Sequence, residues 1–386
     1  MQFFRAIATG ADLEAACRDA AATVRSQAGA APFDFTLVFA SPRYGALIDR
    51  LPVLMHEALP TRALVGCSAA VVVDEQRSVE GRHAIAVLAG RLPNTRVDMV
   101  AIANADLPSP DAGPAAWRAL FPECAGPRTG MIVLGEPYHG DPAALLAGLD
   151  FGFPGVTKVG GIASGSRHPE GHVLFCGRQA HRSGAVVLAL AGEVGLDGIV
   201  APGCRPFGCA GRVTKARDHR LLEIDGAPAR TFVRKQLAAL SGEERAVAQT
   251  SPLLLGLAPD PFEPGDAADA GFLVRSILGI DADGEFVTCR HLPVGRSIRL
   301  LMRDREAGVD SLRRNLGRSD AASAQAAVLF QCLGRSSDDH REFAAAAPHV
   351  PLVGFHCNGE IGPLAGQTHL HSYSAAFGIF RPQRPR

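Results

Sequence analysis

The segment Ala327–Cys332 (AVLFQC) has the composition of a buried strand, and Leu352–Phe355 (LVGF) begins a second strand after a helical stretch. Ser337 and Asp338 stand where they would cap the intervening helix. Ser374–Phe380 (SAAFGIF) then completes a strand–helix–strand–strand unit. This alternation of strand and helix predicts an α/β fold.

The same order of elements occurs earlier in the chain. A first pass begins with Phe35–Ala40 and ends with His83–Leu92, and a second begins with Met131–Leu134 and ends with Gly184–Leu190. A further pass is predicted between residues 221 and 280. Three of the four passes carry a Val-Gly step at the start of a strand, within Leu64–Cys67, Lys158–Gly161 and Leu352–Phe355.

The spacing of these units is about 90 residues, which exceeds that of solenoid repeats and favours duplication within a compact body. One helix per unit covers one face of a sheet, yet Ala185–Ala191 (AVVLALA) is apolar on both faces. We therefore expect mixed sheets stacked face to face with helices outside, in α–β–β–α layers. The glycine steps serve either tight packing between backbones or a ligand-lined seam.

The overall charge excludes partners that bind through electrostatics alone. Among 386 residues, 39 are Lys or Arg and 39 are Asp or Glu, so the formal net charge is zero. Nucleic acid is therefore not an expected partner. The content of 47% hydrophobic and 20% charged residues is typical of a packed globular protein, and the length favours two or three domains.

The cysteines and the apolar segments indicate the compartment. Nine cysteines without a CxxC pair favour neither a disulfide framework nor a structural zinc site, and a reducing environment accounts for them simply. The first residues lack the pattern of a signal peptide. The longest apolar runs, such as Gly184–Gly192, are far shorter than the ~20 residues that cross a bilayer. The sequence predicts a cytoplasmic protein without membrane insertion.

No strong catalytic signature is present, since the GxSxG, HExxH and Walker A patterns are all absent. The glycine-rich stretch Gly160–Ser166 follows a strand and offers backbone amides that could hold an anion. It leads into another loop, however, and not into a helix. A bent connecting loop is therefore favoured over a phosphate cradle.

Unusual polar residues are concentrated in the last quarter of the chain, next to predicted strand ends. Because α/β folds commonly bind ligands at such ends, we expect these segments to converge on one site. The candidates are Cys332, Arg335, His356, Cys357, Asn358 and Glu360, together with His369 and His371 at the edge of the next strand.

Each candidate also has a plain structural interpretation. In this interpretation Glu360 accepts hydrogen bonds from the amides of its own turn, and the thiols of Cys332 and Cys357 are small apolar core groups. His369 and His371 share one face of a strand, as a metal pair or as ordinary surface histidines. Arg335 offers a planar, permanently charged fork that suits a ligand carboxylate.

The order of several short motifs resembles the FIST domain family over nearly the whole chain. On this resemblance, residues 1–217 correspond to the N-terminal FIST domain and residues 218–386 to the C-terminal one. The motifs are Gly66–Ser68, Gly160–Ser164, Gly203–Phe207, Leu222–Gly226, Arg275–Asp281, Cys332–Arg335, Gly359–Pro363 and His369–Ser372.

The resemblance implies a sensory module for a small ligand, such as an amino acid or a related molecule. Signalling would pass through a separate, non-covalently bound partner, for example a histidine kinase. In the ligand site, Arg335 and Arg275 would hold a carboxylate, and Asn358 or Glu360 an amine.

Three alternatives stay open. A branch of the family consists of haemoproteins that sense nitric oxide and regulate a histidine kinase or a cyclic-di-GMP enzyme. Here a haem would require His356, His369 or His371 as its axial ligand in an apolar pocket. A protein-interaction adaptor is the second alternative. An enzyme with Cys332 or Cys357 as nucleophile is the third and is disfavoured, so we predict that the chain is not an enzyme.

Overall fold

The computed structural model describes residues 1–109, 111–124, 129–259 and 271–383. The chain forms two compact units. Residues 1–201, 312–370 and 375–386 make up one of them, which we call the three-sheet unit, and residues 202–311 and 371–374 make up the other, the inserted unit. Within the described ranges, no helix has both the length and the apolar character needed to cross a membrane.

The three-sheet unit contains three repeats of one element order: strand, helix, strand, helix, strand, hairpin, strand. The first repeat consists of β1 (Gln2–Thr9), α1 (Leu13–Ala28), β2 (Phe33–Ala40), η1 (Pro42–Arg50), α2 (Leu51–Ala58), β3 (Thr61–Ser68), β4 (Val71–Asp74), β5 (Ser78–Glu80) and β6 (Ala84–Arg91). The second consists of β7 (Thr95–Ile102), η2 (Asn104–Asp106), α3 (Pro114–Arg118), η3 (Pro122–Cys124), β8 (Thr129–Gly135), α4 (Pro142–Gly152), β9 (Lys158–Ile162), η4 (Pro169–Gly171), β10 (Leu174–Cys176), β11 (Gln179–His181) and β12 (Ala185–Gly192).

The third repeat has the same order but is interrupted after its first strand by the inserted unit. It consists of β13 (Val194–Pro202), α7 (Arg305–Arg318), η5 (Ala321–Ser323), β21 (Ala326–Cys332), α8 (Asp339–Ala346), β22 (Leu352–Cys357), β23 (Glu360–Leu364), β24 (Gln367–His371) and β25 (Ser374–Pro382). The opening strand of each repeat was not predicted from the sequence. In β1 the reason is that most side chains are only partly buried, so the strand lacks a continuous apolar run.

Each repeat builds most of one six-stranded sheet, and a hairpin from a different repeat completes it. The sheet orders are β1-β6-β2-β3-β10-β11, β7-β12-β8-β9-β23-β24 and β13-β25-β21-β22-β4-β5. In every sheet the two strands that flank the second helix are parallel, as in the pairs β2–β3, β8–β9 and β21–β22. The exchange of hairpins is cyclic, so no repeat has a complete sheet without another.

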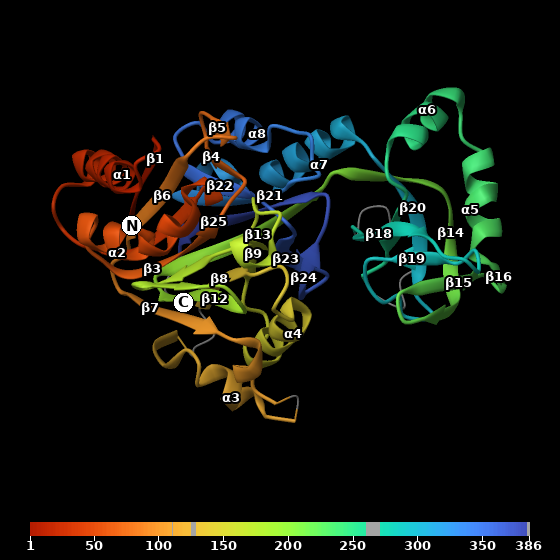
Figure 1. Ribbon diagram of the computed structural model, residues 1–386, viewed down its shortest axis with the longest axis horizontal. Helices are drawn as coiled ribbons and strands as arrows, with labels where there is room; N and C mark the ends of the chain where they lie inside the picture. Colours follow the sequence, from red (N-terminus) through yellow and green to blue (C-terminus); the bar gives the residue numbers. More distant parts are fainter. Residues whose placement is uncertain (110, 125–128, 260–270, 384–386) are drawn as a thin grey trace. The chain divides into compact units, whose positions relative to one another are not determined.

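The three sheets share one apolar core. This core includes side chains from all three, such as Phe39, Leu188 and Phe355, while separate clusters join the opposite face of each sheet to its own helices. Figure 1 shows α1 and α2, α3 and α4, and α7 and α8 outside their respective sheets. The predicted α/β class with mixed sheets is confirmed. The two-sheet α–β–β–α layering is not confirmed, because three sheets contribute to the common core.

The three glycine steps have one structural explanation. Gly66, Gly160 and Gly354 lie in the second strand of each parallel pair. A Cβ atom at these positions would lie 1.8, 1.8 and 2.1 Å from a main-chain carbonyl oxygen of the neighbouring strand. Such distances exclude any side chain unless the backbone moves. The glycines therefore serve close backbone packing, as one of the two sequence interpretations holds.

Beyond these glycines, the three strand ends are joined in a ring of hydrogen bonds, which we call the strand-end ring. The amide of Ser164 donates to the carbonyl of Ser68 at 3.0 Å, and the amide of Asn358 donates to the carbonyl of Ile162 at 3.0 Å. The Ser164 hydroxyl closes the ring, since it accepts from the amide of Ala70 at 2.9 Å and donates to the carbonyl of His356. The ring links all three repeats where the chain passes from one sheet to another.

The inserted unit is built around a seven-stranded sheet in the order β14-β20-β17-β18-β19-β15-β16. Its elements are β14 (Cys204–Arg217), β15 (Arg220–Ile224), β16 (Ala227–Pro228), α5 (Ala229–Ala238), α6 (Gly242–Thr250), β17 (Leu254–Leu257), β18 (Leu273–Ile280), β19 (Phe286–Thr288) and β20 (Ser297–Arg303). The pass predicted between residues 221 and 280 lies here and is not a copy of the repeat. The two strands that flank its helices, β15 and β17, are not neighbours in this sheet, whereas in a copy they would form a parallel pair.

We predict that Gly160→Ala lowers the free energy of unfolding by at least about 2 kcal/mol, because the new methyl group would meet the main chain of Val133. Urea denaturation followed by circular dichroism measures the change. Gly279→Ala is the matched control, since it lies in strand β18 with open space around its Cα. Equal stabilities of the two variants would contradict the close-packing explanation.

Candidate functional site

The carboxyl ends of β21 and β22 bring several predicted residues together. The two strands are parallel, and Cys332 on β21 is in register with Cys357 on β22. His356 precedes Cys357 in β22, and Glu360 begins β23 after a short turn that contains Asn358. We call this group, with the neighbouring start of α8, the third-repeat cluster. These residues come together because the two parallel strands end at the same edge of the sheet.

Cys357 and Glu360 are fully buried next to each other. The Cys357 Sγ lies 3.5 Å from Oε1 of Glu360 and 3.4 Å from the carbonyl oxygen of Gln331. Burial, followed by the proximity of the Glu360 carboxyl, raises the pKa of the Cys357 thiol well above its usual range. The thiol is therefore protonated at neutral pH, which is unfavourable for a nucleophile.

Asn358 joins this turn to the strand end of the second repeat. Its side-chain amide donates to the carbonyl of Ala163 at 2.8 Å, in addition to the main-chain bond within the strand-end ring. The residue itself is exposed to solvent. The Asn358 Nδ2 thus stabilises the turn, and the remaining part of the carboxamide faces the surface.

Arg335 is buried, and its guanidinium holds a carboxylate of its own chain. Nε and Nη2 donate to the two carboxylate oxygens of Asp339 at 2.5 and 3.0 Å, and Nη1 donates to the carbonyl of Ala201 at 3.1 Å. The fork that the sequence suggested for a ligand carboxylate is thus occupied by the first residue of α8. Arg335 fixes the start of α8 and the end of β13 relative to β21.

His340 and Gln331 belong to the same cluster and were missed by the sequence analysis. His340 is 2% exposed, and neither ring nitrogen has a hydrogen-bond partner among the described residues. Gln331 is equally buried; its Nε2 donates to the carbonyl of Ser337, while its Oε1 has no partner in the described part of the chain. The sequence offered a weak signal for these two residues. Gln331 is a polar residue in an otherwise apolar strand, and His340 closely follows the residues that were expected to cap the helix.

The two histidines of the cluster are neutral in the folded protein. Burial, followed by the positive charge of a protonated His340, lowers the pKa of His356 to about 4, against the opposing effect of Asp338. Burial likewise lowers the pKa of His340, against the opposing effects of Asp338, Asp74 and Asp339. Neutral imidazoles offer one donor and one acceptor each, so the cluster presents both kinds of group.

Two further predicted site residues, Arg275 and His371, belong to the inserted unit and not to the three-sheet unit. Arg275 lies on β18, where Nη1 donates to the carbonyl of Val274 at 2.9 Å and the buried Nε has no partner among the described residues. Burial, followed by the charge of Arg290, lowers the pKa of Arg275. His371 is buried with 3% exposure. A ligand-binding role for either residue stays a prediction.

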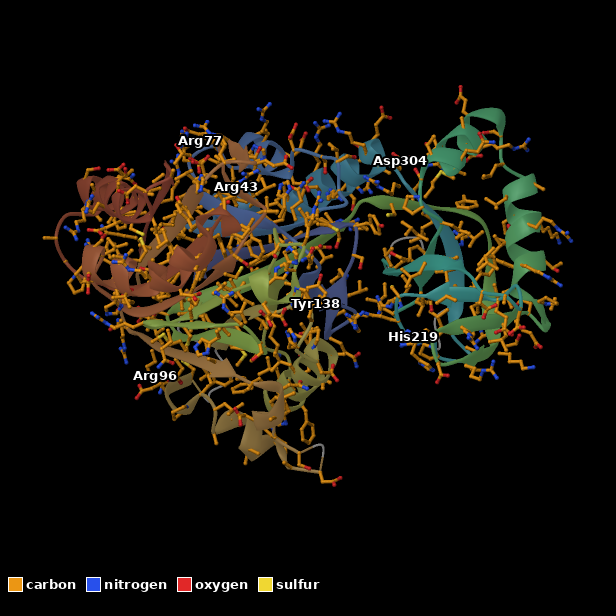
Figure 2. The ribbon with its side chains drawn as sticks, viewed as in Figure 1. Arg43, Arg77, Arg96, Tyr138, His219 and Asp304 are labelled. Atoms are coloured by element: carbon orange, nitrogen blue, oxygen red, sulfur yellow. The ribbon has the colours of Figure 1, made fainter. Side chains whose placement is uncertain are left out.

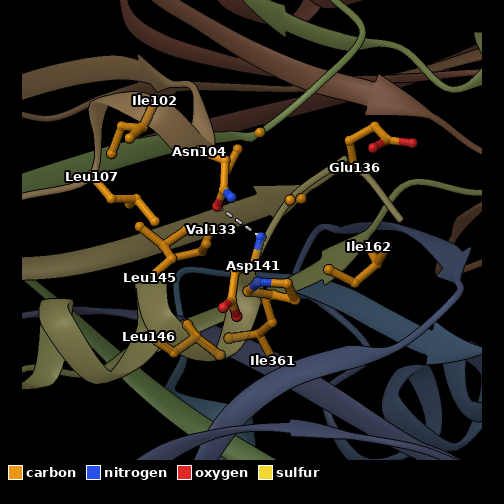
Figure 3. Close-up of a pocket in the computed structure, with 15 residues that line it drawn as sticks. Ile102, Asn104, Leu107, Val133, Glu136, Asp141, Leu145, Leu146, Ile162 and Ile361 are labelled. Carbon is orange, nitrogen blue, oxygen red and sulfur yellow. Dashed lines mark hydrogen bonds between the residues drawn. The ribbon is translucent and has the colours of Figure 1, made fainter. Parts of the chain in front are cut away.

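The equivalent strand end in the second repeat carries a small cavity of about 20 Å³, shown in Figure 3. It lies between the end of β8 and the start of α4, where the amide of Asp141 donates to Oδ1 of Asn104 at 3.0 Å. Glu136 lines it and is 1% exposed, with Oε1 lacking a partner in the described ranges. The volume suits about one water molecule, so this cavity is too small for an organic ligand in its present form.

Two family models match this chain in sequence. The FIST N domain matches residues 34–227, and the FIST C domain matches residues 229–363. The chain belongs to the FIST family. FIST domains are sensory, signal-transduction domains. The division at residue 217 stays a prediction, and the compact units of this FIST protein are each discontinuous or inserted in sequence.

Mycobacterial proteins are similar to this FIST protein over almost their whole length. An uncharacterized protein of Mycobacterium bovis is 29% identical over 393 residues, covering 97% of each chain. An uncharacterized protein of Mycobacterium tuberculosis is 28% identical over 388 residues, covering 97% of this chain and 98% of the relative. The similarity therefore includes the inserted unit as well as the three repeats.

We predict that Arg335→Met destabilises the protein by about 3–5 kcal/mol, because it leaves the buried Asp339 carboxylate without its partner. The double variant with Asp339→Leu should be less destabilised than the sum of the single variants. Urea denaturation of the wild type, the two single variants and the double variant gives the coupling energy of the double-mutant cycle. The exposed pair Glu14–Arg18 is the control, where Arg18→Ala should cost no more than about 0.5 kcal/mol.

We predict a contribution of His356 to acid sensitivity. Its folded-state pKa of about 4 is lower than the ordinary value of 6.5, so the unfolded chain binds more protons between these values. The free energy of unfolding should therefore fall as pH decreases from about 6.5 toward 4, by about 2 kcal/mol from this group after allowance for its partial exposure. Denaturation curves of wild type and His356→Gln at pH 7 and pH 5 measure it. Parallel losses in both proteins would contradict the prediction.

Proposed function

We propose that this FIST protein is a sensor that binds a small polar ligand at the third-repeat cluster and signals through a separate protein partner. The observation that carries the proposal is the set of buried side-chain atoms without hydrogen-bond partners in the described residues. These atoms are both ring nitrogens of His340 and Oε1 of Gln331. They lie next to the carboxyl ends of parallel strands, where α/β proteins commonly bind ligands.

The energetic argument is that unpaired buried polar groups are costly. Each buried donor or acceptor that loses its partner costs about 1–3 kcal/mol. His340 and Gln331 thus carry a penalty that a bound ligand, or water in its absence, would relieve. A ligand that supplies the missing hydrogen bonds gains affinity by removing this penalty, which gives the site selectivity for polar molecules.

The cluster favours a ligand with both donors and acceptors. The neutral rings of His340 and His356 provide both kinds of group, and Gln331 Oε1 is an acceptor. Amino acids and related small molecules have this combination of groups. In this proposal Arg335 acts by positioning α8 through Asp339, and Asn358 and Glu360 lie on the side of the cluster toward β23.

The surroundings of Cys357 do not favour a cysteine enzyme. The raised pKa of the thiol and the adjacent carboxyl of Glu360 oppose formation of a thiolate. The sensory character of FIST domains agrees with a role in binding. We therefore propose that the third-repeat cluster recognises a molecule without transforming it.

A haem-based sensor is the second candidate. The environment of His356 fits haem poorly, because its charged and titratable neighbours are His340 and Asp338, whereas an axial histidine needs an apolar pocket. Haem ligation through His369 or His371 stays a prediction. A visible absorption spectrum of the purified protein, before and after addition of haem, tests it through the Soret band.

We predict that an amino acid or small acid raises the midpoint of thermal unfolding. At about 100 times its Kd, such a ligand adds about 2.7 kcal/mol of stability. His340→Leu should abolish the shift, whereas His349→Leu, a matched change at an exposed residue after the same helix, should retain it. A shift of equal size in both variants would exclude the third-repeat cluster as the site.

The proposed signalling partner is tested by affinity capture, with and without the ligand that the thermal-unfolding experiment identifies. A captured histidine kinase or cyclic-di-GMP enzyme whose retention changes at least several-fold with ligand would support the sensory proposal. Retention that is identical under both conditions, and in the His340→Leu variant, would favour the protein-interaction adaptor instead.

A further inference from the structure

A groove lies at the strand end of the first repeat, remote in sequence from the third-repeat cluster. It has a volume of about 660 Å³ and is formed by the start of η1 and the connection between β9 and β10. Four basic residues line it, against one acidic residue, Glu170. The basic residues are Arg43, Arg167, His168 and Arg182. Its three arginines exceed its one carboxylate, although the formal net charge of the whole chain is zero.

One wall of the groove is held in a defined shape by its glycines. Gly165 has a φ of +96°, and a Cβ there would lie 2.8 Å from the amide nitrogen of Ala70 and from Cγ of Pro42. A Cβ at Gly171 would lie 1.9 Å from the hydroxyl of Ser166, which exchanges two hydrogen bonds of 3.0 Å with the main chain of His168. The connection is therefore a compact loop packed against the strand-end ring.

Arg182 ties the two walls together and is not available for a ligand. Its guanidinium donates to Asp49 of η1 at 2.6 Å and to the main-chain carbonyl of Glu170. Arg43 and Arg167 differ, because no hydrogen bond or ion pair involves either guanidinium among the described residues. Arg43, labelled in Figure 2, follows the end of β2 in the three-sheet unit. Two unpaired guanidinium groups thus line one concave surface.

The lining is not polar throughout. Pro42, Ala46 and Ile48 contribute apolar atoms from η1, on the same groove as Arg43. A guanidinium binds carboxylates and phosphates through paired hydrogen bonds, and an apolar surface beside it accommodates the hydrocarbon part of a ligand. These features together suit an organic anion better than an inorganic ion.

We propose that this groove binds a small organic anion, whose carboxylate or phosphate group pairs with Arg43 and Arg167 and whose apolar part packs on Pro42 and Ala46. The site is separate from the third-repeat cluster and does not depend on it. It provides this FIST protein with a second ligand site, next to the strand-end ring, since Val173 in the connection between β9 and β10 exchanges hydrogen bonds of 2.8 and 3.1 Å with Ser68.

Isothermal titration calorimetry at constant ionic strength tests the proposal with two probes, benzoate and phenyl phosphate. The first tests a carboxylate and the second a phosphate, each on the same apolar body. The double variant Arg43→Ala/Arg167→Ala is expected to weaken binding of the preferred probe at least tenfold. The control Arg50→Ala/Arg178→Ala removes the same charge from exposed residues that do not line the groove, and should bind like wild type.

Thermal unfolding without the probes shows that each variant is folded, since neither guanidinium makes a hydrogen bond or ion pair within the described ranges. Equal weakening in both double variants would indicate unspecific charge attraction and overturn the proposal. So would the absence of binding of both probes at millimolar concentration. The variant His340→Leu is expected to bind the anion normally, so failure of the sensory proposal and failure of this one are distinguished.

Discussion

The close approach of backbones at the three parallel strand pairs is the constraint on which the three-sheet unit depends. Gly66, Gly160 and Gly354 leave no room for a Cβ beside the neighbouring main chain. Immediately beyond them, the strand-end ring joins the three repeats, and the Ser164 hydroxyl supplies its last link. Bulkier residues would separate the strands at the point where each chain segment leaves one sheet for another.

The cyclic exchange of hairpins follows from this arrangement. Each second parallel strand leads into a hairpin that completes the sheet of a different repeat, so the stability of one sheet depends on the others. The shared core has the same consequence, because its side chains come from all three sheets. We infer that the three repeats unfold together, although each has the same order of elements.

The repeats provide a common scaffold for three different strand ends. The first has an open, basic groove, the second a water-sized cavity beside Glu136, and the third the buried polar groups of His340 and Gln331, with Cys357 packed in the shared core. Burial decides the chemistry of the third, since it keeps the thiol protonated and the imidazoles neutral. The arrangement is therefore better suited to recognition than to nucleophilic catalysis.

The amino-acid sequence was sufficient to predict the α/β class, the repeated unit and the positions of the Val-Gly steps, because hydrophobic periodicity and the absence of a side chain are local properties. Whether those steps serve backbone packing or a ligand was decided only by the structure. It also predicted that Cys332 would lie near Cys357, since parallel pairing follows from the strand–helix–strand order. The third predicted pass was wrong because a strand–helix–strand order does not by itself fix which strands pair, and here β15 and β17 are not neighbours in their sheet. Only the folded chain revealed that three sheets share a core, that Asp339 occupies the fork of Arg335, and that the ring nitrogens of His340 have no hydrogen-bond partner in the described part of the chain. These properties depend on contacts between distant segments, which no local pattern encodes.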